Sequence, residues 1–421
     1  MTTLPAIPSP RRASLATIFL IVFIDLMGFG ILLPNQQYYG EMFGLPVFWL
    51  VMIGPSYSLF QFLFAPVLGR WSDRIGRRPV LIVSQAGTLF GFAVLYAAHY
   101  FTGHLAWLGI TFLYASRVID GISGGNISTA SAYIADITTP ENRAKGMGLI
   151  GAAFGLGFIF GPLIGGLVGG NFGIEWVPVV AAVFSTTALI LTITTLPESL
   201  TPQAARESAG RRWSINTIGQ VLQRPIVGAL VLMGFVNGFA FAGMEQTLSL
   251  LIQDRLALSK ENASKASGYL FAGIGVIIVL IQGGAIRHLV KRFGEVPLVI
   301  VGPVLIAGGL AVLGAGYPAN QWVGFAGGCF FLAVGSSLFN PSIQGLISRH
   351  AAASEQGEVL GANQGMASLA RALGPILAGW LYAAYLPGTP YYAAAALTLL
   401  VAIWAAVIQR KLHPPAIGAP K

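Results

Sequence analysis

Long apolar runs separated by short polar breaks are the feature that most limits how this chain can fold. A helix that crosses the hydrocarbon core of a bilayer requires about 20 mostly apolar residues. Twelve runs reach this length, and they cover residues 14–36, 46–69, 79–99, 104–137, 143–171, 175–196, 223–253, 264–290, 296–317, 321–349, 357–386 and 389–410. The runs are too long for barrel strands and lack the two-residue alternation of such strands. We therefore expect an all-α integral membrane protein with twelve transmembrane helices.

The charge content excludes several classes of soluble protein. Charged residues make up 9% of the 421 residues, whereas a soluble domain contains about 25%. The chain therefore cannot be a soluble enzyme or DNA-binding protein. Its single cysteine, Cys329, excludes an intrachain disulfide, a thiolate zinc site and an iron–sulfur cluster. The sequence has no ATP-binding or dinucleotide-binding motif, and its five histidines all fall at helix ends or in tails. We therefore expect no enzyme activity, no cofactor and no bound metal.

Basic residues indicate how the chain is oriented, because cytoplasmic loops of membrane proteins are enriched in Lys and Arg. With both termini inside, three of the 24 Lys and Arg residues lie in outer loops, two (Arg117 and Arg371) lie in predicted helices, and the other 19 lie in inner segments. The net charge of +9 is thus a topology signal, and no nucleic-acid partner is expected. We predict cytoplasmic termini and a bacterial inner (plasma) membrane, with the first helix retained as an anchor.

The two halves of the chain are similar in sequence. At offsets of 213 and 214 residues, Gly54 matches Gly268, Asn126 matches Asn340, and Gly161-Pro162 matches Gly374-Pro375. We predict two pseudo-symmetric six-helix bundles, 1–196 and 223–421, joined by a polar cytoplasmic linker at 197–222. Parallel repeats of this kind form transporters whose site lies between the halves near mid-membrane.

Two motifs in the first half carry glycines at regular spacing. A loop motif at 69–79 combines glycines that permit a tight turn with an acid and arginines that can form a breakable cytoplasmic clasp. The alternative is a plain basic loop held inside by its charge. The candidate gate residues are Gly69, Asp73, Arg74, Gly76, Arg77, Arg78 and Asp136. The fifth run contains the second motif, small residues that let helices approach closely: Gly151, Gly155, Gly157, Gly161, Pro162 and Gly165.

Together with Asp25–Gly30 in the first run and Arg117–Gly121 in the fourth, these motifs resemble the signatures of the major facilitator superfamily (MFS). The resemblance is to its drug:proton antiporter branch with twelve helices, especially the tetracycline-efflux proteins. It implies the MFS fold, a proton gradient as energy source, and a role in proton coupling for Arg117. Two segments depart from the pattern. Position 287, the counterpart of Asp73, is an arginine, and the stretch 35–39 (NQQYY) is unusually polar.

Five charged residues lie well inside predicted helices, where each costs about 2.5–3.5 kcal/mol on insertion scales and therefore marks a partner or a water-filled cavity. They are Asp25, Arg117, Asp120, Glu245 and Arg371. Arg117 and Asp120 are three residues apart and can pair. The pair either only fixes helix packing or keeps a carboxylate ionised until a proton arrives. Asp25 has no basic residue within a turn, and burial favours the neutral form of a carboxyl group. It is either a proton carrier or is hydrogen-bonded to another helix.

The proton-coupling candidates are therefore Asp25, Arg117, Asp120 and Glu245. Arg371 is either the partner of Glu245 or a contact for an anion. The residues expected to line a substrate cavity are Tyr114, Gly121, Gly124, Ser128, Asn237, Phe241, Gln364 and Arg371.

The sequence favours a secondary transporter that exports small amphipathic or drug-like compounds in exchange for protons by alternating access. One alternative is a proton symporter or facilitator for uptake of a metabolite. Another is a membrane receptor or scaffold that does not transport. We expect membrane lipid, protons and a small-molecule substrate as partners, and a functional monomer.

Overall fold

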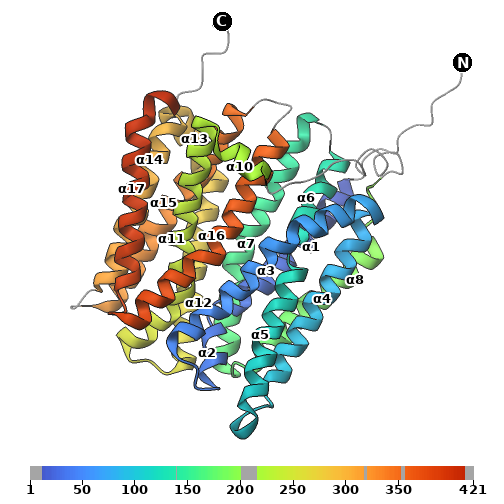
Figure 1. The fold of residues 1–421 in the computed structure, drawn as a ribbon, viewed down its shortest axis with the longest axis vertical. Coiled ribbons are helices and arrows are strands. Elements are labelled where there is room, and N and C mark those ends of the chain that lie inside the picture. The colour runs from blue at the N-terminus through green and yellow to red at the C-terminus, as the bar shows by residue number, and fades with distance from the viewer. Residues whose placement is uncertain (1–11, 139, 201–215, 317–319, 352–355, 413–421) are drawn as a thin grey trace, which may run out of the picture.

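The computed structural model describes residues 12–138, 140–200, 216–316, 320–351 and 356–412. In these residues the chain is almost entirely helical and contains no strand (Figure 1). The first half contains α1 (Arg12–Leu32), α2 (Gln36–Glu41), α3 (Val47–Ile75), α4 (Arg77–Ala98), η1 (Gly103–Leu105), α5 (Ala106–Ser123), α6 (Asn126–Ile137), α7 (Pro140–Asn171) and α8 (Trp176–Thr195). The second contains α10 (Asn216–Leu222), α11 (Pro225–Leu256), α12 (Lys260–Leu280), η2 (Ile281–Ala285), α13 (Ile286–Phe293), α14 (Glu295–Ala315), α15 (Gln321–His350), α16 (Gln356–Ala384) and α17 (Thr389–Leu412).

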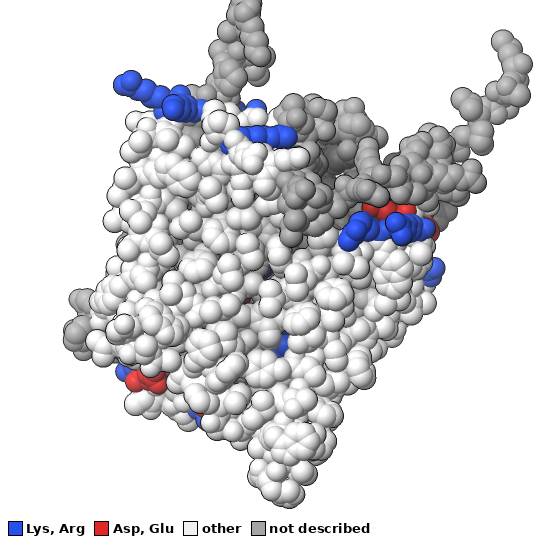
Figure 2. Space-filling model, viewed as in Figure 1, with Lys and Arg blue, Asp and Glu red and all other residues white. Residues whose placement is uncertain are grey.

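The predicted all-α membrane fold is confirmed. Within the described residues, eleven helical stretches are long and apolar enough to cross a membrane. The remaining predicted span is α16, whose 29 residues pack against α11 and α3 and include the charged Arg371. In the view of Figure 2, most visible Lys, Arg, Asp and Glu residues lie toward the two ends of the molecule, and the broad band between them shows little charge apart from a small basic patch near its centre. That band is the surface that lipid tails would contact.

Three helices differ from the sequence expectation, and glycine or polar residues explain two of the differences. The predicted run 104–137 is broken between α5 and α6 at Gly124-Gly125, because glycine weakens a helix interior. The first run ends at Leu32, and the polar stretch that follows forms the short helix α2, whose residues 36–40 are buried. The eighth span starts at Lys260 and contains one π-helical turn, η2.

The predicted linker is only partly described. Residues 201–215 of the 197–222 segment lie outside the described residues, and 216–222 form α10, which contacts α11 and α16. We call the two ends of the molecule the α2 end and the Arg77 end. Helix α1 runs toward the α2 end, and α3 runs back from there toward Arg77. Figure 1 shows α2 at one end and α10 and α13 toward the other.

Helices α7 and α12 bring the two halves into contact, and the separation between these helices increases from the α2 end to the Arg77 end. A methyl carbon added to Gly166 would lie 2.9 Å from the Cα atom of Gly268. One added to Gly155 would lie 3.4 Å from Val279, and one added to Gly151 would have no atom within 4 Å. These two helices therefore touch backbone to backbone at the α2 end and diverge toward the Arg77 end.

Candidate functional site

Asp25 lies in the middle of α1 and is held by a residue from the broken fourth span. Asn126, the first residue of α6, donates a hydrogen bond from Nδ2 to Asp25 Oδ2 at 2.8 Å. The second oxygen of the carboxyl group, Oδ1, is buried without a hydrogen-bond partner. The structure thus gives Asp25 an amide partner on another helix, one of the two sequence interpretations, and leaves its second oxygen without a hydrogen bond. The role of Asp25 as a proton carrier stays a prediction.

A cavity of about 30 Å³ lies against this carboxyl group. Its polar lining comes from four spans and consists of Asp25, Tyr57, Thr88, Asp120, Gly124 and Asn126. Apolar side chains such as Phe29 and Phe92 complete the wall. Since one water needs about 10–15 Å³ when volume is measured in this way, the cavity has room for about two water molecules.

The ion pair predicted from sequence spacing is formed. Arg117 Nη1 lies 3.2 Å from Asp120 Oδ2, and both side chains are almost fully buried. The guanidinium group also lies over the ring of Phe92, 5.9 Å from its centroid. Arg117 Nη2 is buried without a partner. Asp120 therefore reaches the Asp25 cavity while carrying its own counter-ion, whereas Asp25 has none.

Glu245 and Arg371 lie on the neighbouring helices α11 and α16 but do not form an ion pair. Their charges attract each other, yet no nitrogen–oxygen contact within 4.0 Å joins these two described residues. Arg371 donates a hydrogen bond from Nη2 to Ser368 Oγ at 3.0 Å. Glu245 is 5% exposed. The guanidinium of Arg371, with five N–H donors, retains capacity for an anionic group.

Of the other cavity candidates, only Gly124 lines the Asp25 cavity. Tyr114 donates to the carbonyl oxygen of Trp49, Gly121 allows α5 to approach the backbone of Tyr57, and Ser128 bonds to the carbonyl of Ala65. In the second half, Asn237 has a buried Oδ1 without a partner. Phe241 packs against the core of that half, and Gln364 is exposed.

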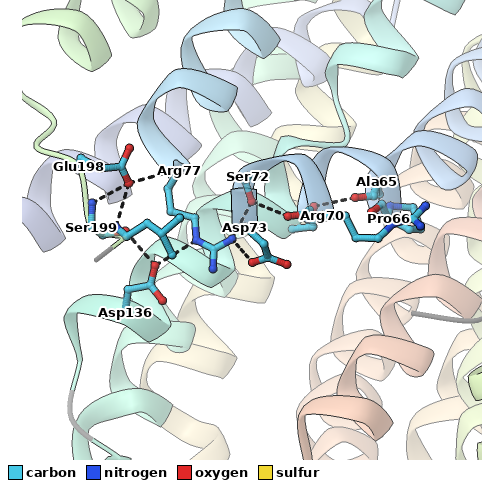
Figure 3. A network of polar contacts seen from close by, with 12 residues as sticks. Ala65, Pro66, Arg70, Ser72, Asp73, Arg77, Asp136, Glu198 and Ser199 are labelled. Atoms are coloured by element: carbon cyan, nitrogen blue, oxygen red, sulfur yellow. Dashed lines mark hydrogen bonds and ion pairs between the residues drawn. The ribbon is translucent and has the colours of Figure 1, made fainter. Parts of the chain in front are cut away.

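The gate motif forms a polar cluster at the Arg77 end (Figure 3). The Arg77 side chain bonds to Ser72 Oγ at 2.7 Å, to Asp136 at 3.0 Å, and to Asp73. Gly76 turns the chain from α3 into α4 with φ of +111°, a region that favours glycine. Among the other gate residues, Gly69 lies beside Ser128, Arg78 bonds to the Ile193 carbonyl, and Arg74 is exposed. Arg70, which was not predicted as a gate residue, bonds to the Pro66 carbonyl.

Sequence reasoning missed Glu198 in this cluster. Its carboxylate accepts hydrogen bonds from the backbone N–H groups of Arg77 at 2.9 Å and Arg78 at 3.1 Å. These are the first two residues of α4, so Glu198 caps that helix and complements its dipole. An acid just after Pro197 was visible in the sequence, but nothing in the pattern indicated that it folds back onto a turn 120 residues earlier.

The α2 end contains a second polar cluster, and three of its contacts, Asn35–Ser264, Gln36–Gln246 and Glu41–Lys260, join the two halves. Asn35 donates to the carbonyl of Gly165 at 2.8 Å and accepts from Ser264 Oγ at 2.6 Å. Gln36 bonds to Gln246, and Lys260 Nζ lies 2.9 Å from a Glu41 carboxylate oxygen. We call these contacts the α2 lock. The polar stretch 35–39, a departure from the family pattern, thus supplies part of it.

The glycine motif of α7 serves two helix contacts. Gly157, Gly161 and Gly165 face α1, where an added methyl carbon would lie 3.0 Å from Leu26 Cβ, 2.8 Å from Gly30 Cα and 1.9 Å from Ile31 O respectively. Gly166 faces α12. Pro162 lies within α7 and is in contact with Gly30. The same helix therefore holds α1, with Asp25, against the interface between the halves.

Comparisons with known proteins agree with this architecture. The family model described as Major Facilitator Superfamily matches residues 18–318 and 286–421. Major facilitator superfamily domain-containing protein 10 of Bos taurus is 30% identical, covering 97% of this chain and 94% of its own. The class D tetracycline resistance protein of Salmonella ordonez is also 30% identical, covering 86% and 88%. The solved structure of the human organic anion transporter MFSD10 (TETRAN) superposes with a TM-score of 0.67 at 27% identity, covering 95% of this chain and 100% of that one.

Proposed function

The chain belongs to the Major Facilitator Superfamily and is a membrane transporter, and from this premise we propose that it exports small amphipathic compounds in exchange for protons by alternating access. The proposal includes cytoplasmic termini, a plasma (inner) membrane and a functional monomer. The Arg77 end then faces the cytoplasm and the α2 end faces outward.

The observation that carries the proposal is the Asp25 carboxyl group beside a cavity with room for water. A carboxyl group that is enclosed in protein without a counter-ion is the kind of group that takes up and releases a proton near neutral pH. Asp25 has one partnered and one unpartnered oxygen. A proton arriving at Asp25 would remove its charge and thereby weaken its hold on a cationic or hydrogen-bonding part of a substrate.

The arrangement of contacts between the halves supports alternating access. The α2 lock and the Gly166–Gly268 contact join the halves at the outward end. The hydrogen bonds of Arg77 with other described residues join elements of the first half, and α7 and α12 diverge beside them. These features fit a state open to the cytoplasm. In the opposite state the α2 lock would break while α7 and α12 close at the cytoplasmic end.

A second candidate substrate class is organic anions. A specific observation favours it: Arg371 is a basic group within the membrane that donates a hydrogen bond to Ser368 and has no ion-pair partner among the described residues. One solved relative is itself named an organic anion transporter. The tetracycline resistance relatives favour drug-like compounds instead.

The experiment is proton release from inverted membrane vesicles on addition of substrate, measured with a pH-sensitive dye. Tetracycline and an amphipathic aromatic carboxylate are suitable first compounds. Asp25→Asn should abolish the proton signal, whereas Asp254→Asn should retain it. Asp254 is a matched control because it is an exposed acid at the outward end, where it accepts a hydrogen bond from Tyr382. Full proton-coupled export by Asp25→Asn would refute the assignment of Asp25, and proton uptake instead of release would favour symport.

A further inference from the structure

The break in the fourth span is the least expected local feature of the first half, and it lies directly at the Asp25 cavity. Helix α5 ends at Ser123 and α6 begins at Asn126, so Gly124 and Gly125 separate two half-helices within the membrane. The cavity is lined by Gly124, Asn126 and Ile127, the residues that surround this new helix start. The break therefore places a helix N-terminus inside the bilayer, beside a carboxyl group.

Close packing fixes the position of the break. A methyl carbon on Gly124 would lie 2.4 Å from the Tyr57 hydroxyl, and one on Gly125 would lie 2.9 Å from the Cα atom of Ala65. Gln61 donates hydrogen bonds to the carbonyl of Gly124 at 2.9 Å and to the Tyr57 hydroxyl at 3.0 Å. One carbonyl freed by the break is thus satisfied by α3, which holds the start of α6 in place.

The second half of the chain does not form this arrangement. At the offset of 214 residues, Asp25 corresponds to Phe239, and the Gly124-Gly125 pair corresponds to Leu338-Phe339. Helix α15 is accordingly unbroken from Gln321 to His350, and Asn340, the counterpart of Asn126, is exposed. The acid, the glycine pair and the buried amide therefore occur together in one half and are all missing from the other.

We propose that Asn126 is a positioning residue, which the break in the fourth span directs onto Asp25 and which sets the pH at which Asp25 exchanges its proton. The inference rests on the proposed function, because it assigns Asp25 as the proton carrier. The Asn126 amide donates a hydrogen bond to the Asp25 carboxylate and so stabilises its charged form. The positive end of the α6 dipole stabilises the same charged form. Without the amide, Asp25 keeps its proton to a higher pH and the substrate loses a charged partner.

The other groups that act on Asp25 come from the remaining helices around the cavity. The amide of Gln85 in α4 lies near Asp25 without a hydrogen bond to it, and Asp120 of α5 acts through its charge. Asp120 is itself paired with Arg117, and Tyr57 of α3 lines the same cavity. Asn126 is distinguished from these by its direct 2.8 Å bond.

The test is a pH titration of Asp25 in the purified full-length protein by infrared difference spectroscopy, which follows the carbonyl band of the protonated carboxyl group. Asp25→Asn identifies the band. Asn126→Leu should raise the titration midpoint by about one to two pH units, since a hydrogen bond to a charged acceptor contributes about that much. In Asn126→Asp, which preserves the shape of the side chain, two neighbouring carboxyl groups resist ionising together, so the pair should lose its second proton at a pH well above the wild-type midpoint. Ser131→Ala should leave it unchanged, because Ser131 bonds only to the Ile127 carbonyl of its own helix.

The possible results test the role of Asn126 separately from the proposed proton-coupled export. A midpoint that does not move in folded Asn126→Leu and Asn126→Asp proteins overturns the inference, as does the absence of any titrating band assigned to Asp25. If Asn126→Leu fails to fold, the Asn126→Asp protein alone decides. A midpoint shift in a protein that shows no proton-coupled transport in vesicles would support the role of Asn126 and refute the exporter. In a coupled exporter, the pH optimum of transport should shift by the same amount as the midpoint.

Discussion

The contact between α1 and α7 gives a sharp prediction about stability, because one glycine there has almost no free space. A methyl carbon on Gly165 would lie 1.9 Å from the carbonyl oxygen of Ile31 and 2.8 Å from its carbonyl carbon. Ordinary contact begins near 3.4 Å, so in Gly165→Ala the helices must separate by about 1.5 Å. Overpacking of this kind costs typically about 1–3 kcal/mol. The hydrogen bond from Asn35 to the Gly165 carbonyl would also be strained.

Gly151 of the same helix provides the matched control. A methyl carbon there meets no atom within 4 Å, and alanine has a better helix propensity than glycine by at most about 1 kcal/mol. Gly165→Ala should therefore unfold at a lower temperature than the wild type in detergent, and Gly151→Ala at the same or a higher temperature. Size-exclusion chromatography after heating measures both. Equal losses in the two variants would refute the packing argument, since sequence alone treats these glycines as one motif.

Two further predictions concern the two ends of the molecule. Gly76→Ala should destabilise the protein more than Gly294→Ala, which changes the turn before α14. Both glycines have positive φ, but only the methyl group at position 76 would collide with Glu198 of the Arg77 cluster. The thermal unfolding temperatures of the two variants measure this difference. At the α2 end, Glu41→Lys and Lys260→Glu should each accelerate substrate exchange, because each breaks a partly exposed pair worth about 0.2–1 kcal/mol. The double charge reversal should restore the wild-type rate, and a double variant that is faster than both single ones would contradict a direct contact.

The sequence predicted the fold well because membrane burial imposes a strong and local constraint. Every backbone polar group in lipid must be satisfied within a helix, so long apolar runs are sufficient to locate the spans. The Arg117–Asp120 pair was equally predictable, since a separation of three residues within one helix fixes their proximity. The family assignment rested on short motifs whose order is preserved along the chain.

Contacts between distant segments were not predictable in this way. The Asn126–Asp25 bond joins residues 101 positions apart, and Glu198 reaches Arg77 across 121 positions. Neither follows from periodicity or spacing. The Gly124-Gly125 pair did carry a signal, because two adjacent glycines weaken a helix. That signal was outweighed by the apolar residues on both sides, which made 104–137 read as one continuous span.

The strength of the α2 lock is consistent with a lock that must open in each transport cycle. Its two side-chain hydrogen-bond links, Asn35 to Ser264 and Gln36 to Gln246, contribute about 0.5–1.5 kcal/mol each. With the partly exposed Glu41–Lys260 pair the total is about 1–4 kcal/mol. Reversing a two-state population from 1:99 to 99:1 requires about 5.5 kcal/mol, and one unit of pH difference supplies about 1.4 kcal/mol per proton. Polar contacts of this total free energy stabilise one state, but the combined free energy of proton transfer and substrate binding is sufficient to break them. Tyr38, Leu50 and Val51 of the first half also pack in one apolar cluster with residues of the second half, so the α2 lock is the polar part of a larger contact that must separate in each transport cycle.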